Sequence, residues 1–163
     1  CPHRRRAGVR ILAVCAGNIC RSPAAEAAIR AAAMEAGLDV DVDSAGTGAW
    51  HIGEPPHPEA VAAGARAGLS IEGRARRVTM ADFDRYDVIL AMDRSNLKDL
   101  MALAPSKASS AKIRLFRTYD PGTTGDEVPD PWGGPTAGYE ETVRIVRAAA
   151  AGLITEISEN ACH

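Results

Sequence analysis

Short β-branched runs alternate with longer helical stretches along this chain. The run VRILAV (9–14) is continuous and apolar, which is typical of a strand buried on both faces. The stretch SPAAEAAIRAAAMEAG (22–37) has proline in its first turn, alanine through its body and a final glycine, so it predicts a helix. The same alternation predicts strands at 40–45, 86–93 and 111–116, and helices at 57–69, 94–105 and 138–160.

This alternation predicts βαβ units, and therefore an α/β fold with a parallel sheet and helices on both faces. The length of 163 residues suits a single domain. We expect a flexible tail over 1–8 and one domain over 9–160. Ligands of such folds bind beyond the carboxyl ends of the strands. Three segments follow predicted strands and should meet at that edge: 15–22, 44–51 and 117–137.

Charge and hydropathy exclude several classes of protein. The net charge of −2 gives no electrostatic basis for binding nucleic acid. No apolar run approaches the ~20 residues of a membrane span, and the N-terminus lacks the apolar centre of a signal peptide. A domain of this size needs no disulfide, so we expect a reduced, cytoplasmic protein. Cys15 and Cys20 lack zinc-ligand spacing, so they need another explanation.

The stretch VCAGNICRSP (14–23) lies where the first predicted strand ends and the first predicted helix begins. Such a junction gathers free backbone N–H groups at the positive end of a helix dipole, which makes an anion site. Gly17 and Asn18 tolerate a positive φ, which lets a tight loop turn its amides inward. Arg21 adds a planar guanidinium that can bind two phosphate oxygens. The stretch therefore predicts a phosphate-binding loop.

Cys15 begins this loop, where the same positive field favours a thiolate. A thiolate beneath a bound phosphate can attack phosphorus and form a phosphocysteine. Arg21 and the loop amides would stabilise the transition state, and Ser22 can donate a hydrogen bond to the thiolate. These fixed dipoles replace a metal, so we expect neither metal nor cofactor. The alternative is a buried cysteine near an arginine that only starts a helix.

The leaving group needs a proton, and Asp130 in VPDPWGGP (128–135) is the candidate general acid. Pro129 and Pro131 flank it and stiffen the loop. An aspartate in such a turn is more often a local hydrogen-bond acceptor, which is the alternative. The predicted position at the same sheet edge as Cys15 favours the acid role.

The chain has only two tryptophans, and both fall in loops of this edge. Trp50 and Trp132 could each cover a local apolar patch. The functional interpretation is that they wall a pocket for a flat ring, which a phosphotyrosine would fill. Phosphoserine would be too short to reach the floor of such a pocket.

The chain resembles the low-molecular-weight protein tyrosine phosphatase family over about residues 9 to 157. The resemblance rests on VCAGNICRSP, DSAGTGAWHIGEPPHP, VILAMDRSN and VPDPWGGP, in that order and spacing. It implies a four-stranded parallel sheet and a metal-free cytoplasmic enzyme that hydrolyses phosphotyrosine in proteins and binds phosphate or similar oxyanions. We expect a monomer with no nucleic-acid or membrane partner.

The resemblance also implies residue roles. Cys15 would be the nucleophile, Arg21 the phosphate clamp and Asp130 the general acid. Cys20 would be a redox partner that captures an oxidised Cys15 as a disulfide, although it could also be a small apolar filler. The remaining implied roles are loop support by Asn18, Ser22 and Ser44, a phosphate loop of Ala16, Gly17, Asn18, Ile19, Cys20, Arg21 and Ser22, and a substrate pocket of Ala16, Ile19, Trp50 and Trp132.

Three departures from the family pattern affect substrate preference. Trp132 and Gly133 stand where many members have two tyrosines, so control by phosphorylation of those tyrosines is lost. Gly73 occupies the place of a histidine that supports the loop network in many members. Ala16 is smaller than the usual residue and widens one side of the pocket.

Three other functions compete with the tyrosine phosphatase. Arsenate reductases of this fold need further cysteines near residues 80 to 90, and residues 78–93 contain none. Protein-arginine phosphatases share a glycine pair after the acid region, but they usually carry threonine where this chain has Ile19. A phosphopeptide-binding module without turnover would lack Cys15 or Asp130, and both are present.

Overall fold

The computed structural model describes residues 8–161, so residues 1–7 of the predicted tail, together with Cys1 and Cys162, lie outside the described part. The elements, in chain order, are β1 (Val9–Cys15), α1 (Arg21–Glu35), β2 (Val40–Gly46), α2 (Pro58–Arg66), α3 (Asp82–Arg85), β3 (Val88–Ala91), α4 (Arg94–Leu103), α5 (Lys107–Ser110), β4 (Ile113–Leu115), the 3₁₀ helix η1 (Phe116–Tyr119) and α6 (Thr136–Ala161).

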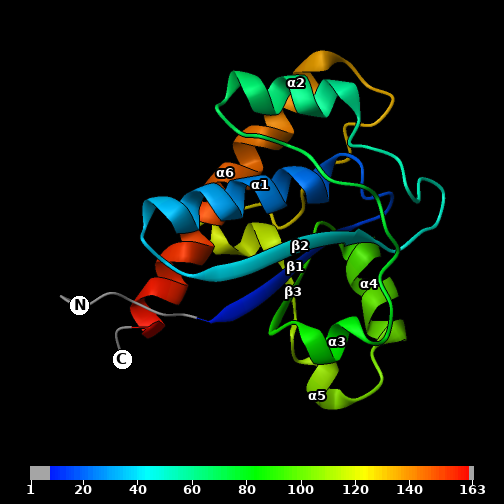
Figure 1. The fold of residues 1–163 in the computed structure, drawn as a ribbon, viewed down its shortest axis with the longest axis vertical. Helices are drawn as coiled ribbons and strands as arrows, with labels where there is room; N and C mark the ends of the chain where they lie inside the picture. Colours follow the sequence, from blue (N-terminus) through cyan, green and yellow to red (C-terminus); the bar gives the residue numbers. More distant parts are fainter. Residues whose placement is uncertain (1–7, 162–163) are drawn as a thin grey trace.

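The four strands form one parallel sheet, as predicted, and their order is β2-β1-β3-β4. Figure 1 labels the first three of these strands. The register pairs Cys15 of β1 with Gly46 of β2, and Val14 of β1 with Ala91 of β3. Strands β1, β2 and β3 therefore end at nearly the same level, and the segments that follow them start from one edge of the sheet. This is the edge on which the sequence placed the ligand site.

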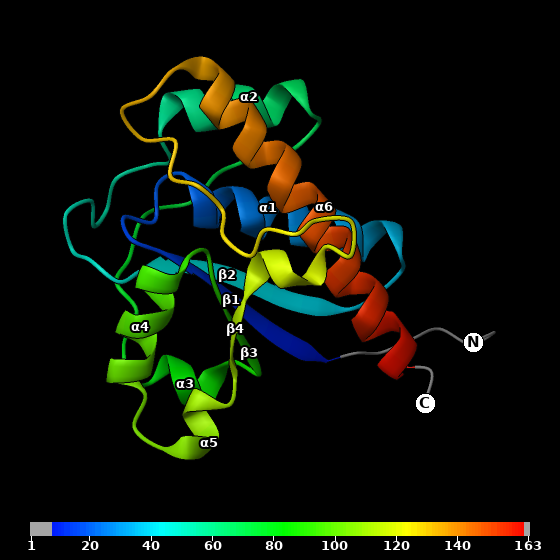
Figure 2. The ribbon, with the colours of Figure 1, turned by 180° about the vertical axis from the view of Figure 1, so that it is seen from behind.

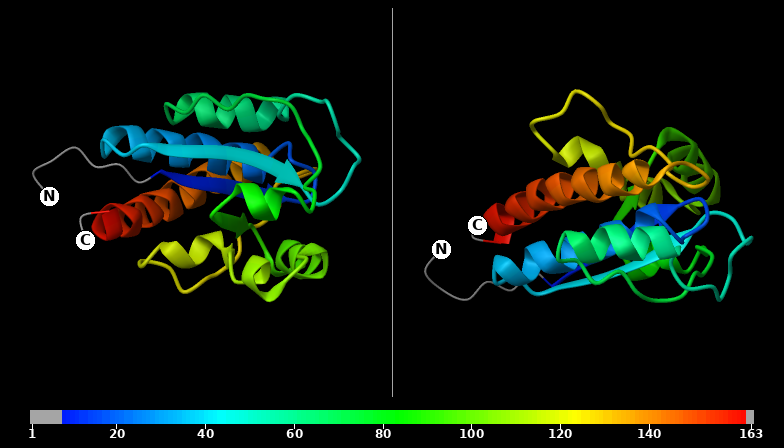
Figure 3. Two further views of the ribbon diagram at one scale, coloured as in Figure 1. Left: turned by 60° about the horizontal axis from the view of Figure 1, so that its bottom comes forward. Right: turned by 90° about the horizontal axis from the view of Figure 1, so that it is seen from above.

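Helices cover both faces of the sheet, which confirms the predicted architecture. Ile11 and Ala13 of β1 are buried in a core shared with α1, α2 and α6. Leu12 and Val14, which alternate with them, are buried in a second core with α3 and α4. Figure 2 shows these two helical layers from behind, and Figure 3 shows the long helix α6 running alongside α1.

Local chemistry shifts several element boundaries from the predicted ones. The helix predicted at 57–69 ends at Arg66, because Gly68 adopts a φ of +79° and stops it. The helix predicted at 22–37 ends at Glu35, and Gly37 follows with a φ of +68°.

Two predicted strands are shorter in the structure. The strand predicted at 86–93 is only β3, because Asp93 has left the sheet to cap α4 by accepting the N–H of Asn96. The strand predicted at 111–116 is only β4, because Phe116 begins η1. The four-residue helices α3 and α5 were not predicted, because they are too short to show a helical period.

The long closing helix α6 spans 136–161, close to its predicted range. None of the helices within residues 8–161 combines the length and the apolar composition that crossing a membrane requires.

Candidate active site

The loop over 16–20 joins the end of β1 to the start of α1, beside the end of β2. It approaches Gly46 so closely that a Cβ there would lie 2.7 Å from the carbonyl oxygen of Ala16. Asn18 has a φ of 58°, a conformation that costs a non-glycine residue roughly 1–2 kcal/mol. The loop is therefore a tight turn built around one left-handed residue.

Gly17 does not adopt the positive φ that the sequence analysis expected of it. Its small size serves a close approach instead, because an added Cβ would lie 3.0 Å from Cδ2 of His51. Of the two residues expected to turn the loop, only Asn18 does so.

Cys15 Sγ lies at the floor of a pocket and has two hydrogen-bond partners. The backbone N–H of Asn18 donates to it at 3.2 Å, and Ser22 Oγ lies 3.0 Å away. The Cys15 residue is only 3% exposed. Within residues 8–161, the backbone N–H groups of Gly17, Ile19 and Cys20 donate to no protein acceptor, so they are free to bind an anion above the sulfur.

Asn18 is the centre of a buried hydrogen-bond network under the loop. Its Nδ2 donates to Ser22 Oγ at 2.9 Å and to Ser44 Oγ at 3.0 Å. Its Oδ1 accepts the backbone N–H of Arg76 at 3.0 Å, and Ser44 Oγ donates to Glu26 at 2.7 Å. The three residues expected to support the loop are thus in direct contact, and the network also uses Arg76 and Glu26, which the sequence analysis missed.

The guanidinium of Arg21 is buried beside the loop. Its Nη1 donates to Asp93 Oδ2 at 2.6 Å and to the carbonyl oxygen of Val128 at 3.0 Å. Burial opposes its charged form, but the negative charges of Cys15 and Asp93 outweigh burial and raise the pKa of Arg21. Asp93 was not predicted as a site residue, although its signal was present: an aspartate just beyond a buried strand, at a helix N-cap.

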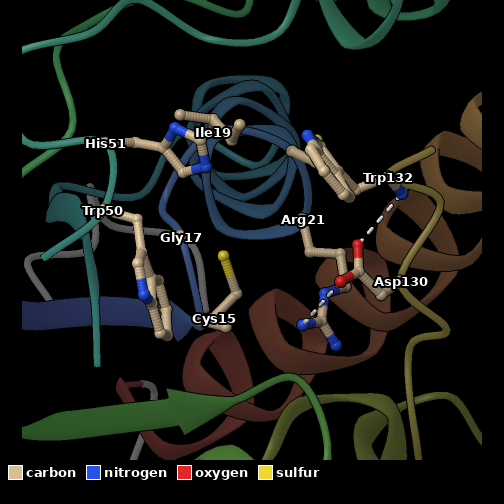
Figure 4. A pocket seen from close by; sticks show the side chains of 10 residues that line it. Cys15, Gly17, Ile19, Arg21, Trp50, His51, Asp130 and Trp132 are labelled. Carbon is tan, nitrogen blue, oxygen red and sulfur yellow. Dashed lines mark hydrogen bonds and ion pairs between the residues drawn. The ribbon is translucent and has the colours of Figure 1, made fainter. Parts of the chain in front are cut away.

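Asp130 lies at the rim of the same pocket (Figure 4). Its Oδ2 is 3.9 Å from Nη2 of Arg21, and its side chain is about half exposed. Its Oδ1 accepts the backbone N–H of Trp132 at 3.1 Å, which is the local hydrogen bond of the alternative interpretation. One oxygen therefore fixes the turn, and the other remains near the pocket.

The pocket has a volume of about 380 Å³. Figure 4 shows Trp50 and Trp132 on opposite sides of Cys15. The two tryptophans are 71% and 59% exposed, so they stand as open walls rather than as covers of a buried patch. The structure brings these residues together around the pocket: Cys15, Ala16, Gly17, Ile19, Cys20, Arg21, Trp50, His51, Asp130 and Trp132.

His51 is a pocket residue that the sequence analysis missed. Its Nδ1 lies 2.9 Å from Oε2 of Glu54, and its ring packs over Gly17. Its position next to Trp50 in the same loop was the available signal.

Cys20 is buried next to the pocket, and both it and Cys15 are free thiols. Burial, reinforced by the negative charge of Cys15, raises the pKa of Cys20 to about 12. The two cysteines of the loop therefore differ in chemistry: Cys15 has hydrogen-bond donors around its sulfur, and Cys20 is held as a neutral thiol.

The departures from the family pattern have visible local effects. Gly133 has a φ of +80°, which a tyrosine would adopt only with strain. Gly73 has a φ of +111°, and an added Cβ there would meet nothing within 4 Å. In this chain the Oδ1 atom of Asn18 accepts the backbone N–H of Arg76.

Over residues 8–161, no three His, Cys, Asp or Glu side chains gather as ligands for a metal ion.

The chain is similar to low molecular weight phosphotyrosine protein phosphatases over most of its length. A family described as low molecular weight phosphotyrosine protein phosphatase matches residues 10–162. A low molecular weight protein-tyrosine-phosphatase of Streptomyces coelicolor is 44% identical over 154 residues, which cover 92% of this chain and 94% of that protein.

The fold is also similar to those of solved phosphatase structures. A protein tyrosine phosphatase from Entamoeba histolytica, with Hepes in its active site, superposes with a TM-score of 0.91 at 32% identity, over 94% of this chain and 99% of that one. The YwlE arginine phosphatase, as a mutant with a phosphorylated active-site serine, superposes with a TM-score of 0.84 at 28% identity, over 93% and 97% of the two chains.

Proposed function

Because the chain belongs to the low molecular weight phosphotyrosine protein phosphatase family, we propose that it hydrolyses phosphotyrosine monoesters in proteins through a phosphocysteine formed on Cys15. The observation that carries this proposal is the setting of the Cys15 sulfur. It accepts the N–H of Asn18 at 3.2 Å, lies 3.0 Å from the hydroxyl of Ser22, and sits beside Arg21 at the floor of one pocket.

In the first step Cys15 Sγ attacks phosphorus while the bond from phosphorus to the phenolic oxygen breaks. Asp130, protonated, gives its proton to the departing phenolic oxygen. The exposure of Asp130 at the pocket rim supports this role, because the leaving group must depart toward solvent.

Arg21 and the free loop amides hold the nonbridging phosphoryl oxygens during this step. The ion pair with Asp93 and the bond to the Val128 carbonyl fix the guanidinium in advance, so little reorganisation is needed when the substrate binds. This arrangement favours the transition state, in which charge spreads over those oxygens.

In the second step a water molecule attacks the phosphocysteine, and Asp130, now a carboxylate, accepts its proton. The bond from phosphorus to sulfur breaks, phosphate leaves and the thiolate is restored. The donors around Cys15 Sγ stabilise the sulfur as a leaving group in this step, as they stabilise the nucleophile in the first.

The walls of the pocket support an aromatic substrate. Trp50 and Trp132 can lie against the faces of a phenyl ring, and Ile19 gives the inner wall an apolar surface. Protein-arginine phosphatase activity, which the fold also carries in YwlE, is not favoured, because an apolar residue at position 19 suits a ring better than a guanidinium.

We further propose that Cys20 protects Cys15 from irreversible oxidation. A peroxide would oxidise the thiolate of Cys15 to a sulfenic acid, and attack by Cys20 would then form a disulfide and release water. The burial of both cysteines on one short loop supports this pairing.

The free thiols of Cys15 and Cys20 also suit a reducing compartment such as the cytoplasm. We expect the enzyme to act there as a monomer.

The test compares initial rates on a phosphotyrosine peptide and a phosphoarginine peptide of the same sequence, with Cys15→Ser as the blank and each reaction run with and without EDTA. We expect preference for the phosphotyrosine peptide and unchanged rates with EDTA. Preference for phosphoarginine would overturn the substrate assignment but keep the mechanism. Absence of turnover on both peptides would overturn the proposed enzyme.

A further inference from the structure

The hydrogen bonds under the phosphate loop run from donor to acceptor in a definite order. This order determines whether the hydroxyl of Ser22 can donate its hydrogen to the sulfur of Cys15. A hydroxyl has one hydrogen, so it can donate to only one acceptor at a time. Ser22 Oγ has two acceptors within reach, Cys15 Sγ at 3.0 Å and the Ala45 carbonyl oxygen at the longer distance of 3.4 Å. The hydrogen of Ser22 reaches Cys15 Sγ, at 3.0 Å, only if the amide of Asn18 presents Nδ2 rather than Oδ1 to Ser22.

A backbone amide is what fixes Asn18 in this orientation. The N–H of Arg76 can only donate, so the Asn18 atom that faces it at 3.0 Å must be Oδ1. This places Nδ2 toward Ser22 and Ser44. On the far side, Ser44 donates its hydrogen to the carboxylate of Glu26 at 2.7 Å and so accepts from Nδ2, which favours the same orientation.

The Arg76 backbone is itself held by its side chain. Two nitrogens of the guanidinium bond the two oxygens of Asp82, both at 3.1 Å, and Asp82 is only 2% exposed. Asp82 also accepts the N–H of Thr79 at 2.8 Å, which ties the ion pair to the start of α3. A two-point pair to a buried carboxylate is among the more rigid contacts of a side chain.

The segment of Arg76 is also joined to the end of β2. Gly46 N–H donates to the Arg76 carbonyl at 2.8 Å, and Val78 N–H donates to the Gly46 carbonyl at 2.8 Å. Asp43 makes a more exposed contact with the guanidinium at 3.3 Å. The side chain of Arg76 therefore points away from the pocket, while its backbone meets the network that supports the loop.

We propose that Arg76, fixed by Asp82, is a positioning residue for Cys15. Its N–H orients Asn18, Asn18 Nδ2 donates to Ser22, and Ser22 donates to Cys15 Sγ. Weakening the ion pair lets the amide of Asn18 turn over, and an Oδ1 facing Ser22 would draw the hydroxyl hydrogen away from the sulfur. This inference deepens the proposed function and rests on it for the role of Cys15 as nucleophile.

The experiment measures the rate at which iodoacetamide alkylates Cys15 as a function of pH, with the labelled peptide identified by mass spectrometry. The variants are Asp82→Asn and Arg76→Met, which break the two-point pair, and Arg76→Lys, which retains one contact. The reagent is neutral, so the rate follows the thiolate without needing turnover. Failure of the proposed function would appear as absent phosphatase activity, whereas failure of this inference would appear in the alkylation profile.

The charged and titratable groups that face Cys15 are unchanged in these variants. They are Arg21 and Cys20 on the loop and helix side, His51 in the loop after β2, and Asp130 and Asp93 near the guanidinium of Arg21. A shift of the alkylation midpoint in these variants therefore reports the hydrogen bond to the sulfur and not a lost charge in the pocket.

We expect Asp82→Asn and Arg76→Met to raise the pH midpoint of alkylation by roughly 0.5–1 unit and to lower kcat/KM by roughly 3- to 10-fold. Arg76→Lys should fall between them and the wild type. Asp43→Asn is the matched control, because Asp43 contacts Arg76 and the hydroxyl of Tyr86 but takes no part in the pair with Asp82, and its midpoint should stay at the wild-type value.

Ile154→Val in α6 is the control for lost stability, because Ile154 is buried in the core and does not line the pocket. If Asp82→Asn and Arg76→Met lower the melting temperature but leave the midpoint unchanged, the ion pair is only structural and the proposal is wrong. The proposal is also wrong if Ile154→Val shifts the midpoint equally. If Arg76→Met fails to fold, Asp82→Asn and Arg76→Lys decide the question alone.

Discussion

Nη1 of Arg21 lies 2.6 Å from Oδ2 of Asp93, at the point where β3 ends and α4 begins. The pair joins two strands of the sheet, because Arg21 follows β1 and Asp93 follows β3. It holds the guanidinium beside the sulfur of Cys15, so the proposed phosphate clamp is in place before a substrate arrives.

Asp93→Asn should weaken the binding of phosphate without unfolding the protein. Asparagine is a good N-cap, so it can keep the bond that Asp93 makes to the N–H of Asn96, but it removes the negative charge that holds Arg21. We expect KM and the inhibition constant of phosphate to rise roughly 3- to 10-fold, with a melting temperature close to the wild type. Steady-state kinetics with phosphate as the inhibitor measure both constants.

Asp126→Asn is a suitable control for this prediction, because Asp126 pairs with the exposed Arg94 and not with Arg21. If Asp93→Asn and Asp126→Asn both retain the wild-type KM, Asp93 does not position the clamp.

Cys15→Ser should abolish turnover and leave the affinity for phosphate largely intact. Serine cannot supply the thiolate nucleophile, but Arg21 and the loop amides remain. We expect turnover to fall by at least roughly 10³-fold and calorimetry to give a dissociation constant for phosphate near that of the wild type. Substantial residual hydrolysis by the variant would remove Cys15 from the role of nucleophile.

Asp130→Ala should affect substrates according to their leaving groups. Phosphotyrosine releases a poor leaving group that needs a proton, so its turnover should fall by roughly 10²–10⁴. Nitrophenolate leaves readily, so nitrophenyl phosphate should lose less. Asp130→Asn, which keeps the size of the side chain, should behave as Asp130→Ala. Equal losses on both substrates would show that Asp130 only fixes the turn at Trp132.

The two cysteines of the loop should react differently. Because the pKa of Cys20 is raised to about 12, this residue stays a neutral thiol at pH values well below 12, and iodoacetamide at pH 7 should label Cys15 first. After a peroxide pulse, dithiothreitol should restore the activity of the wild type but little of the activity of Cys20→Ser. Equal recovery of both proteins would reduce Cys20 to a packing residue.

The sequence predicted the fold well because its signals are local and strong. The run before Cys15 is continuously apolar, and the alanine-rich stretch after it has proline and glycine at its ends. Element boundaries were less accurate, because single residues decide them through contacts that a pattern does not contain. Asp93 is one example: its bond to Asn96 and its pair with Arg21 take it out of the predicted strand.

The candidate site was predicted in part, for a similar reason. Cys15, Arg21 and Asp130 carry distinctive chemistry and were found from their types and surroundings. Arg76 contributes a backbone N–H to the site, and no residue type marks a backbone contact in advance. Gly17 was assigned the wrong conformation, because small size and positive φ both favour glycine, and only the ring of His51 above it shows which applies.

Trapping of the phosphoenzyme shows whether the reaction passes through a phosphocysteine at Cys15. The wild type and Asp130→Ala are mixed with a nitrophenyl phosphate substrate, quenched within milliseconds, and digested for mass spectrometry, with Cys15→Ser as the control. We predict a phosphate adduct on Cys15 in both active proteins, more abundant in Asp130→Ala, and none in Cys15→Ser. Turnover without any adduct on Cys15, or an adduct on another residue, would show that Cys15 is not the nucleophile.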